Sequence, residues 1–239
     1  MPVSRDVANR LADLADRYGL RAGAADRLGL LLELVAGEHS SITAVRDPAQ
    51  GVDVHVADSL VALELPEVRD ARRIADLGSG GGFPGLVLAI ALPDGHMALV
   101  ESVGRKAAFL RTAIERLDLP TTEAVQARAE DWAEGIGAHD LVTARALAPL
   151  SVLIEYAAPL LAPGGSLVAW KGARDHAEEA DGEAAASALG MSELARRAVR
   201  PFRAARDRHL YLSSKVSDTP PGYPRRPGMA RKRPIRASS

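Results

Sequence analysis

The sequence predicts an α/β protein with a central, mostly parallel seven-stranded sheet and a helical extension before it. Three observations lead to this fold class. Short apolar runs alternate with longer helical patterns after Arg69, a glycine-rich turn follows the first of these runs, and apolar residues recur at helical spacing before them. Because strands that alternate with helices form right-handed crossover units, we expect the sheet to be largely parallel.

The N-terminal extension, residues 1–68, is predicted to be helical. Apolar residues recur three and four positions apart over residues 7–14 and 28–35, which is the spacing of one helical face. The expected elements are a helix ending near Gly19, a second ending near Gly37, a loop over residues 40–51 with a turn at Asp47-Pro48, and a third helix over residues 52–65 stopped by Pro66.

Residues 69–216 are predicted to form the α/β domain. The expected strands cover residues 74–77, 96–101, 122–126, 139–144 and 166–171, with two more near residues 192–200 and 207–215. The expected helices begin at Pro84 and cover residues 104–117, 150–161 and 175–189, and Pro163-Gly164-Gly165 is expected to be a turn. In such sheets a ligand lies at the carboxyl ends of the strands, near the switch in strand order.

The composition indicates a cytoplasmic globular protein. Hydrophobic residues make up 47% and charged residues 26% of the 239 positions, which is ordinary for a globular domain. The N-terminus lacks the apolar core of a signal peptide, and the run over residues 28–32 is far too short to span a bilayer, so no membrane partner is expected. There is no cysteine, which excludes disulfides, cysteine-ligated metals and a thiolate nucleophile, and we expect no metal.

Residues 217–239 are predicted to be a basic tail. Six basic residues and no acidic residue lie between Arg225 and Arg236, and without these six charges the formal net charge of −1 becomes −7. A basic tail on an acidic body suits contact with a polyanion such as RNA, and the alternative is a disordered, solvated end. The candidate RNA contacts in the tail are Arg225, Arg226, Arg231, Lys232 and Arg233.

The segment over residues 76–85, DLGSGGGFPG, is the most informative motif. Glycines let the backbone turn sharply and approach a ligand, because no Cβ intrudes. Gly78 and Gly80 are therefore candidate cofactor contacts. The G-x-G-x-x-G spacing of Gly80, Gly82 and Gly85 also fits a dinucleotide fold, and a third alternative is a tight strand–helix turn that holds no ligand.

Acidic residues near the predicted strand ends favour one cofactor over the other. Asp76 ends the first strand, where a carboxylate would face a pyrophosphate unfavourably but suits the ammonium of a methionine moiety, directly or through water. Glu101 ends the second strand, where it can accept both ribose hydroxyls, as in NAD folds too. Ala129 and Glu130 follow the third strand, where they can meet an adenine edge. This pattern favours a class I, Rossmann-like methyltransferase fold that binds S-adenosylmethionine.

Motifs in the same order along nearly the whole chain resemble the RsmG (GidB) family, the guanine-N7 methyltransferases of small-subunit ribosomal RNA. The matching pieces are residues 41–48 (SITAVRDP), 55–60 (HVADSL), the glycine loop with Phe83-Pro84-Gly85, Glu101-Ser102, 104–106 (GRK), Phe109-Leu110, Ala129-Glu130, 144–146 (ARA), 170–172 (WKG) and 223–228 (YPRRPG). Two positions depart from the family pattern: Ser41 stands where the family usually has Asn, and Val54 stands where it usually has Arg.

The resemblance implies the residues of the site. It places cofactor contacts on Gly78, Phe83, Ala129, Glu130 and Arg145, with the Glu101-Ser102 turn at the ribose. It also implies that Arg145 faces the methyl acceptor and that His55 and Lys171 contact RNA. The alternatives are a surface salt bridge for Arg145 and an ordinary helix face for His55, Asp58 and Ser59.

The residues themselves narrow the acceptor only to a ring nitrogen or a hydroxyl. The Asn/Asp-Pro-Pro-Tyr/Phe motif of exocyclic-amine methyltransferases is absent after the fourth strand, where the chain reads Arg145-Ala146-Leu147-Ala148-Pro149. A guanine N7 carries a lone pair and no proton, so its methylation needs alignment rather than a general base. Arg145 is therefore expected to orient the substrate.

Two other functions stay open at this point. An NAD-dependent oxidoreductase would need a Tyr-Lys or His dyad, and Tyr156 has no Lys three or four residues later. A non-catalytic RNA-binding protein with the same fold is disfavoured by Asp76, Glu101 and Glu130, because carboxylates around a cleft repel RNA unless they serve a cofactor. We therefore predict S-adenosylmethionine-dependent N7-methylation of a guanine in 16S ribosomal RNA, with the RNA or the small ribosomal subunit as partner and the enzyme a monomer.

Overall fold

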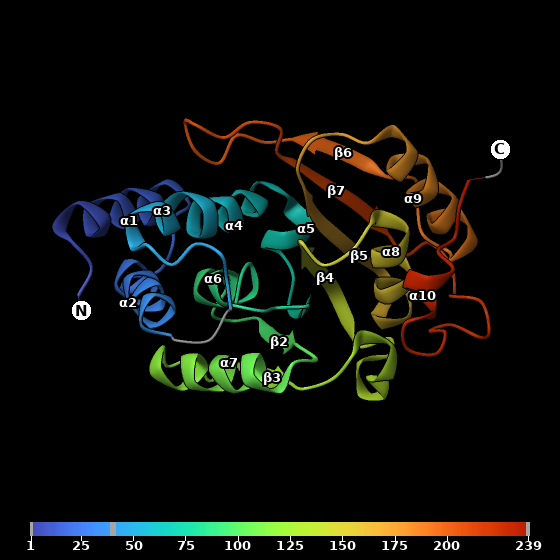
Figure 1. The fold of residues 1–239 in the computed structure, drawn as a ribbon, viewed down its shortest axis with the longest axis horizontal. Coiled ribbons are helices and arrows are strands. Elements are labelled where there is room, and N and C mark those ends of the chain that lie inside the picture. Colours follow the sequence, from blue (N-terminus) through green and yellow to red (C-terminus); the bar gives the residue numbers. More distant parts are fainter. Residues whose placement is uncertain (1, 39–41, 238–239) are drawn as a thin grey trace.

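A computed structural model describes residues 2–38 and 42–237. Ser41, the first residue of the family-like stretch, lies outside the described residues. Figure 1 shows the N-terminal helices at one end of the molecule, the sheet in the middle and the C-terminal segment at the other end. The two termini therefore lie far apart along the longest axis.

The predicted seven-stranded, mostly parallel sheet is confirmed. Its strand order is β3-β2-β1-β4-β5-β7-β6, in which β1 to β5 pair in parallel and β7 is antiparallel to both β5 and β6. The strands are β1 (Arg73–Leu77), β2 (His96–Val100), β3 (Thr122–Val125), β4 (His139–Arg145), β5 (Leu161–Lys171), β6 (Ala195–Ala198) and β7 (His209–Ser214). The strand order reverses between β1 and β4, so a ligand is expected at the carboxyl ends of these two strands.

The helices precede, follow and alternate with the strands (Figure 1). The α-helices are α1 (Arg5–Arg17), α2 (Ala24–Gly37), α3 (Pro48–Gly51), α4 (Asp58–Leu60), α5 (Pro66–Arg69), α6 (Gly85–Ala91), α7 (Gly104–Arg116), α8 (Leu150–Leu160), α9 (His176–Ala188) and α10 (Met229–Lys232). The other helical turns are η1 (Val52–Ala57), η2 (Val61–Glu64), η3 (Ala129–Asp131) and η4 (Ala133–Gly135).

Alternation along the buried strands creates two cores, one on each face of the sheet. In β1, Ile74 belongs to the core shared with the N-terminal helices and α6, whereas Ala75 and Leu77 belong to the core shared with α8 and α9. Successive side chains of a strand point to opposite faces, which explains this division. Asp76 therefore lies on the α6 side, the face on which the glycine loop continues.

The N-terminal extension packs onto the sheet rather than standing apart from it. Residues of α1 and α2, such as Leu11 and Leu28, share one continuous core with Ile74 of β1. The predicted loop over residues 40–51 was wrong at its end, because α3 begins at Pro48. The Asp47 side chain accepts from the backbone N–H of Gln50, and proline fits the first helical position, so the expected turn is a helix start. Pro66 follows the end of a helical stretch, as predicted, and also begins the short helix α5.

Two predictions about the C-terminal third need correction. Pro163-Gly164-Gly165 was expected to be a turn, but these residues lie within β5. The register between β5 and β4 shifts there, between His139 and Leu141 of β4. Described residues of the basic tail are packed against the protein, since Ala230 is only 1% exposed and Tyr223 and Ile235 contact the core beside α8. The alternative of a disordered, solvated tail is therefore wrong for these residues.

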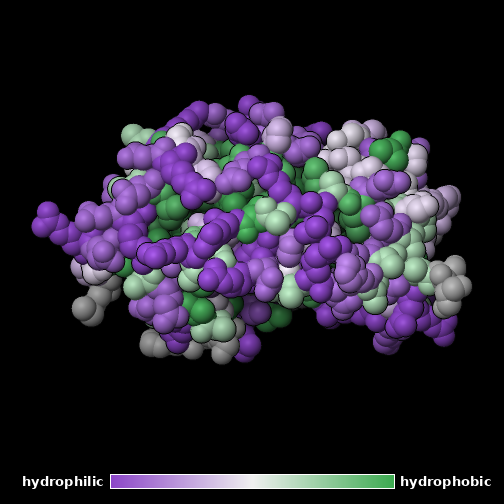
Figure 2. Space-filling model, turned by 90° about the horizontal axis from the view of Figure 1, so that it is seen from above, coloured by the Kyte–Doolittle hydropathy of each residue, from purple (hydrophilic) through white to green (hydrophobic). Residues whose placement is uncertain are grey.

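Figure 2 shows the side of the molecule on which α1, α4 and the β6–β7 hairpin lie in Figure 1. Hydrophilic residues dominate this face, and smaller groups of hydrophobic residues lie among them. Among the helices of residues 2–38 and 42–237, none has the length and apolarity needed to cross a bilayer.

Candidate active site

The glycine loop leaves the carboxyl end of β1 and enters α6. Gly78, Gly80 and Gly82 all have positive φ angles of +67°, +54° and +88°, which L side chains rarely adopt. A Cβ on Gly78 would stand 2.6 Å from Leu147 Cδ1 of the loop after β4. The loop is thus close-packed as well as sharply turned, and both features require glycine.

The buried Asp76 side chain binds the end of this loop. The residue is fully buried, and its Oδ1 accepts from the Thr143 hydroxyl at 2.8 Å while its Oδ2 accepts from the Gly85 N–H at 3.3 Å. Burial raises the pKa of the Asp76 carboxyl to about 6, against the lowering by its hydrogen bonds. Because Asp76 is fully buried, it positions the glycine loop and makes no direct contact with an ammonium in this arrangement, and the predicted contact through water stays a prediction.

The raised pKa of Asp76 makes a testable contribution to stability. Because the folded-state pKa, about 6, lies above the usual value, the stability that Asp76 contributes is full below its unfolded pKa and is lost as pH rises through 6. We therefore expect wild type to lose stability relative to Asp76→Asn between pH 4.5 and 7.5. Urea unfolding of both proteins at several pH values measures this, and parallel curves would contradict it.

Glu101 joins the end of β2 to the glycine loop. Its Oε2 accepts from the Gly80 N–H at 3.1 Å, and its Oε1 accepts from the Val103 N–H at 2.8 Å. The side chain is 6% exposed. Each carboxylate oxygen has two acceptor sites, so each still has one left to accept a hydroxyl.

A cavity of about 80 Å³ lies at the carboxyl ends of β1, β2 and β3. Four predicted cofactor residues line it, namely Gly78, Ser102, Ala129 and Glu130. Tyr156 of α8 and Arg231 of α10 complete its wall. Gly78 offers backbone without a side chain, and Ala129 and Glu130 line the cavity where the adenine edge is predicted. Glu101 does not line the cavity but holds the Gly80 N–H of the same loop. These residues fit the parts of S-adenosylmethionine.

A second cavity of about 420 Å³ lies at the carboxyl ends of β4 and β5, and both apolar and charged side chains form its walls. It contains His55, Arg145 and Lys171, the residues predicted to face the acceptor. Arg145 donates to the Asp58 carboxylate at 2.8 Å and to the Val54 carbonyl at 3.0 Å. Its side chain is 17% exposed, so the alternative of a surface salt bridge does not describe it. Arg145 does not line the smaller cavity, but its guanidinium lies over the Phe83 ring of the glycine loop, so its predicted cofactor contact stays a prediction.

Phe83 and His55 stack between the glycine loop and this second cavity. Their ring centroids lie 4.1 Å apart and nearly parallel. Burial lowers the pKa of His55, and its Nε2–H donates to the Val45 carbonyl at 2.8 Å. His55 is therefore neutral near physiological pH, and its ring packs against Phe83, which itself does not line the smaller cavity.

Trp170 and Arg208 line the second cavity and were not predicted as site residues. The Trp170 Nε1–H donates to the Asp58 carbonyl at 2.7 Å, and Arg208 Nε lies 3.5 Å from Asp58 Oδ1. Because β7 runs antiparallel to β5, the residue just before β7 lies at the carboxyl end of β5. If the last strand had been predicted to be antiparallel, Arg208 would have been expected at the carboxyl end of β5.

The predicted RNA contacts of the tail divide into two groups. Arg225 pairs with the buried Glu155, and Arg231 donates to the Leu147 carbonyl at 2.7 Å and lines the smaller cavity. Arg225 is thus committed to the protein itself, which corrects its assignment to RNA, whereas Arg231 is exposed and its RNA contact stays a prediction. Arg226, Lys232 and Arg233 are exposed. Lys171 donates to the Ala148 carbonyl at 3.0 Å and pairs with Glu178.

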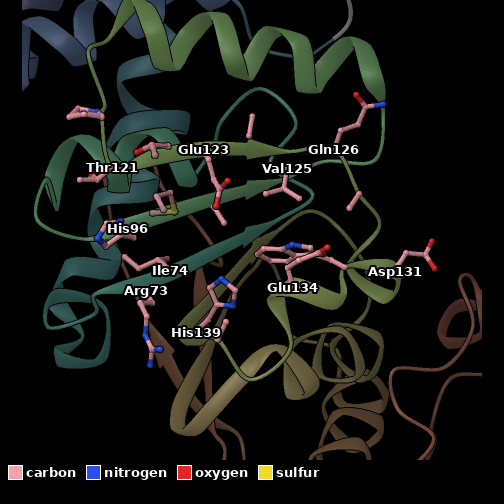
Figure 3. A pocket seen from close by; sticks show the side chains of 18 residues that line it. Arg73, Ile74, His96, Thr121, Glu123, Val125, Gln126, Asp131, Glu134 and His139 are labelled. Carbon is pink, nitrogen blue, oxygen red and sulfur yellow. The ribbon is translucent and has the colours of Figure 1, made fainter.

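A third cavity, the largest of these at about 790 Å³, lies along the face of β1, β2 and β3. Figure 3 shows side chains of these strands, such as Ile74, Glu123 and Val125, projecting into it beside His139. The short turns η3 and η4 follow β3, and Trp132 between them packs against His139. This cavity contains none of the predicted site residues and is separate from the glycine loop.

Comparison with known proteins identifies the family. Residues 28–211 match the family model of rRNA small subunit methyltransferase G. The chain belongs to this methyltransferase G family. One relative, ribosomal RNA small subunit methyltransferase G of Rubrobacter xylanophilus, is 39% identical and covers 98% of this chain and 93% of its own. The protein of the same name from Desulfitobacterium hafniense is 38% identical over 83% of each chain.

Solved structures agree on the methyltransferase fold. An S-adenosylmethionine-dependent methyltransferase, SibL, superposes with a TM-score of 0.58 at 16% identity and covers 90% of this chain and 71% of its own. The fibrillarin pre-rRNA processing protein of Methanococcus jannaschii gives 0.54 at 16% identity, with 68% and 74% covered. The class I fold predicted from the glycine loop is therefore confirmed, and the family leaves no support for an NAD-dependent oxidoreductase or a non-catalytic RNA-binding protein.

Proposed function

We propose that this protein transfers the methyl group of S-adenosylmethionine to N7 of one guanine in small-subunit (16S) ribosomal RNA, in the cytoplasm. The observation that carries the proposal is the presence of two cavities at the carboxyl edge of the sheet, which the consecutive residues Leu147 and Ala146 line. One is lined by the glycine loop and the ends of β2 and β3, and the other by Arg145, Lys171 and Arg208. The family and the names of its relatives support the RNA substrate.

The second cavity suits a purine base that has left its stack. Enzymes that modify a base must bring it into a pocket, and this cavity offers apolar walls and the Trp170 ring. Arginine and lysine donate to guanine O6 and N7 in protein–nucleic acid recognition. Because N7 is the reacting atom, we assign Arg145 and Arg208 to O6 or to a flanking phosphate.

No strong general base faces this cavity among the described residues. His55 is neutral and donates to Val45, and Asp58 is held by Arg145 and Arg208. A guanine N7 has a lone pair in the ring plane and carries no proton, so it needs none. Catalysis then rests on alignment, which contributes up to roughly 7–11 kcal/mol in favourable cases.

Asp58 also has an electrostatic role in this scheme. Methylation gives the base a positive charge, which nearby guanidinium groups would oppose. The Asp58 carboxylate lies 2.8 Å from Arg145 and 3.5 Å from Arg208, so it offsets part of their charge. S-adenosylmethionine supplies the electrophilic methyl group on its sulfonium, and the protein supplies orientation and a nearly neutral surrounding.

The direct test uses small subunits that lack the modification. Labelled methyl transfer from S-adenosylmethionine, followed by aniline cleavage at N7-methylguanine, is expected to give one cleavage in the RNA. Incorporation without aniline cleavage would move the acceptor away from N7. No incorporation into subunits, free RNA or assembly intermediates, despite cofactor binding, would contradict the substrate.

The exposed basic residues of the tail are expected to add salt-dependent affinity for RNA. Each cation that neutralises a phosphate contributes about 0.7 to 0.9 to the slope of log affinity against log salt. Replacing Arg226, Lys232 and Arg233 together with alanine should therefore reduce that slope by about 2 to 3.

A charge-matched control separates contact from net charge. Arg69, Arg72 and Arg73 are exposed and lie at the amino edge of the sheet, away from both site cavities. Their triple alanine variant removes the same charge and should leave the salt slope unchanged. Equal effects of the two variants would show that only net charge matters.

A further inference from the structure

The C-terminal segment, residues 223–235, is anchored beside α8. Arg225 Nε donates to Glu155 Oε1 at 2.6 Å, and its Nη2 pairs with the other oxygen of this buried carboxylate. Ala230 is 1% exposed and packs into the core on the α8 face. Figure 1 shows α10 next to α8 at the C-terminal end of the molecule. The segment is thus a folded part of the protein.

From this anchor the segment reaches the smaller cavity. The Gly228 N–H donates to Glu130 Oε1 at 2.9 Å, and Arg231 Nη2 donates to the Leu147 carbonyl at 2.7 Å. Glu130 and Leu147 line that cavity together with Gly78, Tyr156 and Arg231 itself. A residue 84 positions beyond Leu147 therefore forms part of the cofactor wall.

The cavity beside this wall is smaller than a typical cofactor pocket. Its volume is about 80 Å³, whereas pockets for small molecules and cofactors have roughly 300–1,000 Å³. The sheet and the glycine loop are fixed by buried contacts such as those of Asp76. The side chain of Arg231 is exposed, and its partners are the Leu147 carbonyl and the Tyr156 hydroxyl, so it can move more readily than the buried parts of the wall.

We propose that the C-terminal segment is a movable wall of the cofactor pocket, in which Arg231 leaves Leu147 and covers the adenine of bound S-adenosylmethionine. A guanidinium group is planar and stacks on flat rings. Arg231 lies on the side of Ala129 and Glu130, where the adenine edge is expected. This inference rests on the cofactor site of the proposed function and adds a binding residue to it.

Calorimetric titration with S-adenosylhomocysteine, which needs no RNA and no turnover, tests the role of Arg231. Arg231→Ala is expected to weaken binding about tenfold or more, because the lost contact involves a charged group. Lys232→Ala is the matched control, since its neighbouring side chain is exposed and does not line the cavity. Unchanged binding by Arg231→Ala would overturn the proposal, and tighter binding would show that Arg231 obstructs the pocket instead.

Trypsin, which cuts after arginine and lysine, tests the closure of the wall in wild type. Saturating S-adenosylhomocysteine should slow cleavage after Arg231 and Lys232, while cleavage after the exposed Arg203 and Arg206 in the β6–β7 loop stays unchanged. Equal rates with and without ligand would overturn the proposal. If wild type does not bind S-adenosylhomocysteine at all, the proposed function fails instead, so the two failures are distinguishable.

Discussion

Replacing Arg145 with alanine is expected to lower kcat/KM for RNA methylation by about 100-fold. The variant loses the proposed contact with guanine O6 or a flanking phosphate, and truncating one partner of a buried charged contact typically costs roughly 2–5 kcal/mol. Arg145 faces the acceptor cavity and does not line the cofactor cavity. The affinity for S-adenosylhomocysteine should therefore stay within about twofold of wild type. Single-turnover methylation with varied RNA concentration and calorimetric titration measure the two quantities separately.

A variant that also changes Asp58, the partner of Arg145, distinguishes lost contact with RNA from damage to the site. The Asp58 side chain is 8% exposed in wild type, and Arg145→Ala leaves Arg208, at 3.5 Å, as its remaining ion-pair partner. A poorly paired carboxylate at such a site destabilises a protein. We expect the double variant Asp58→Asn with Arg145→Ala to regain stability but not activity. Recovery of activity in the double variant would show that Arg145 serves only to neutralise Asp58.

Lysine at position 145 tests the geometry of the contact. A lysine keeps the positive charge but lacks the planar fork that donates to two acceptors at once. Arg145 makes its bonds to the Asp58 carboxylate and the Val54 carbonyl from the one nitrogen Nη1. A lysine ammonium could replace these two bonds, but it has no second fork nitrogen for the acceptor. We therefore expect Arg145→Lys to retain more stability than Arg145→Ala and to remain well below wild-type activity.

The fold could be predicted from the sequence because its signals are local. Short apolar runs and the glycine turn identified the strands β1 to β5 within a few residues. A prediction failed where one residue type serves two structures, as at Pro48, which begins a helix that was read as a turn. Pro66 follows the end of one helical stretch, as predicted, and also begins the next helix. Proline fits both a turn and a first helical position, so only the packing of the chain decides between them.

The site was less predictable because its partners are distant in sequence. Asp76 was expected at the cofactor, but Thr143, 67 residues later, occupies one of its oxygens from the neighbouring strand. Arg225 was expected at RNA, but Glu155, 70 residues earlier, holds it. Charge and position in the chain indicated which residues were functional candidates. Which partner each one takes depends on the tertiary structure, and for Arg225 that partner is the protein itself.

Replacing Gly78 with alanine is expected to reduce the affinity for S-adenosylhomocysteine by at least about tenfold, through space rather than through backbone strain. An alanine Cβ would stand 2.6 Å from Leu147 Cδ1, so the leucine must move. Leu147 lines the same cavity as Gly78. Either the new methyl group or the displaced leucine therefore takes room from the cofactor, and the glycine is needed for this close approach.

Gly137 provides the matched control for this substitution. Its φ of +64° is nearly the same as the +67° of Gly78, but nothing lies within 4 Å of an added Cβ. Both alanine variants should lose about 1 kcal/mol of stability from the left-handed backbone. Only Gly78→Ala should lose cofactor affinity and, with it, methyl transfer. If thermal unfolding and titration show the same losses for both, strain alone explains the glycine, and the crowding against Leu147 has no part in binding.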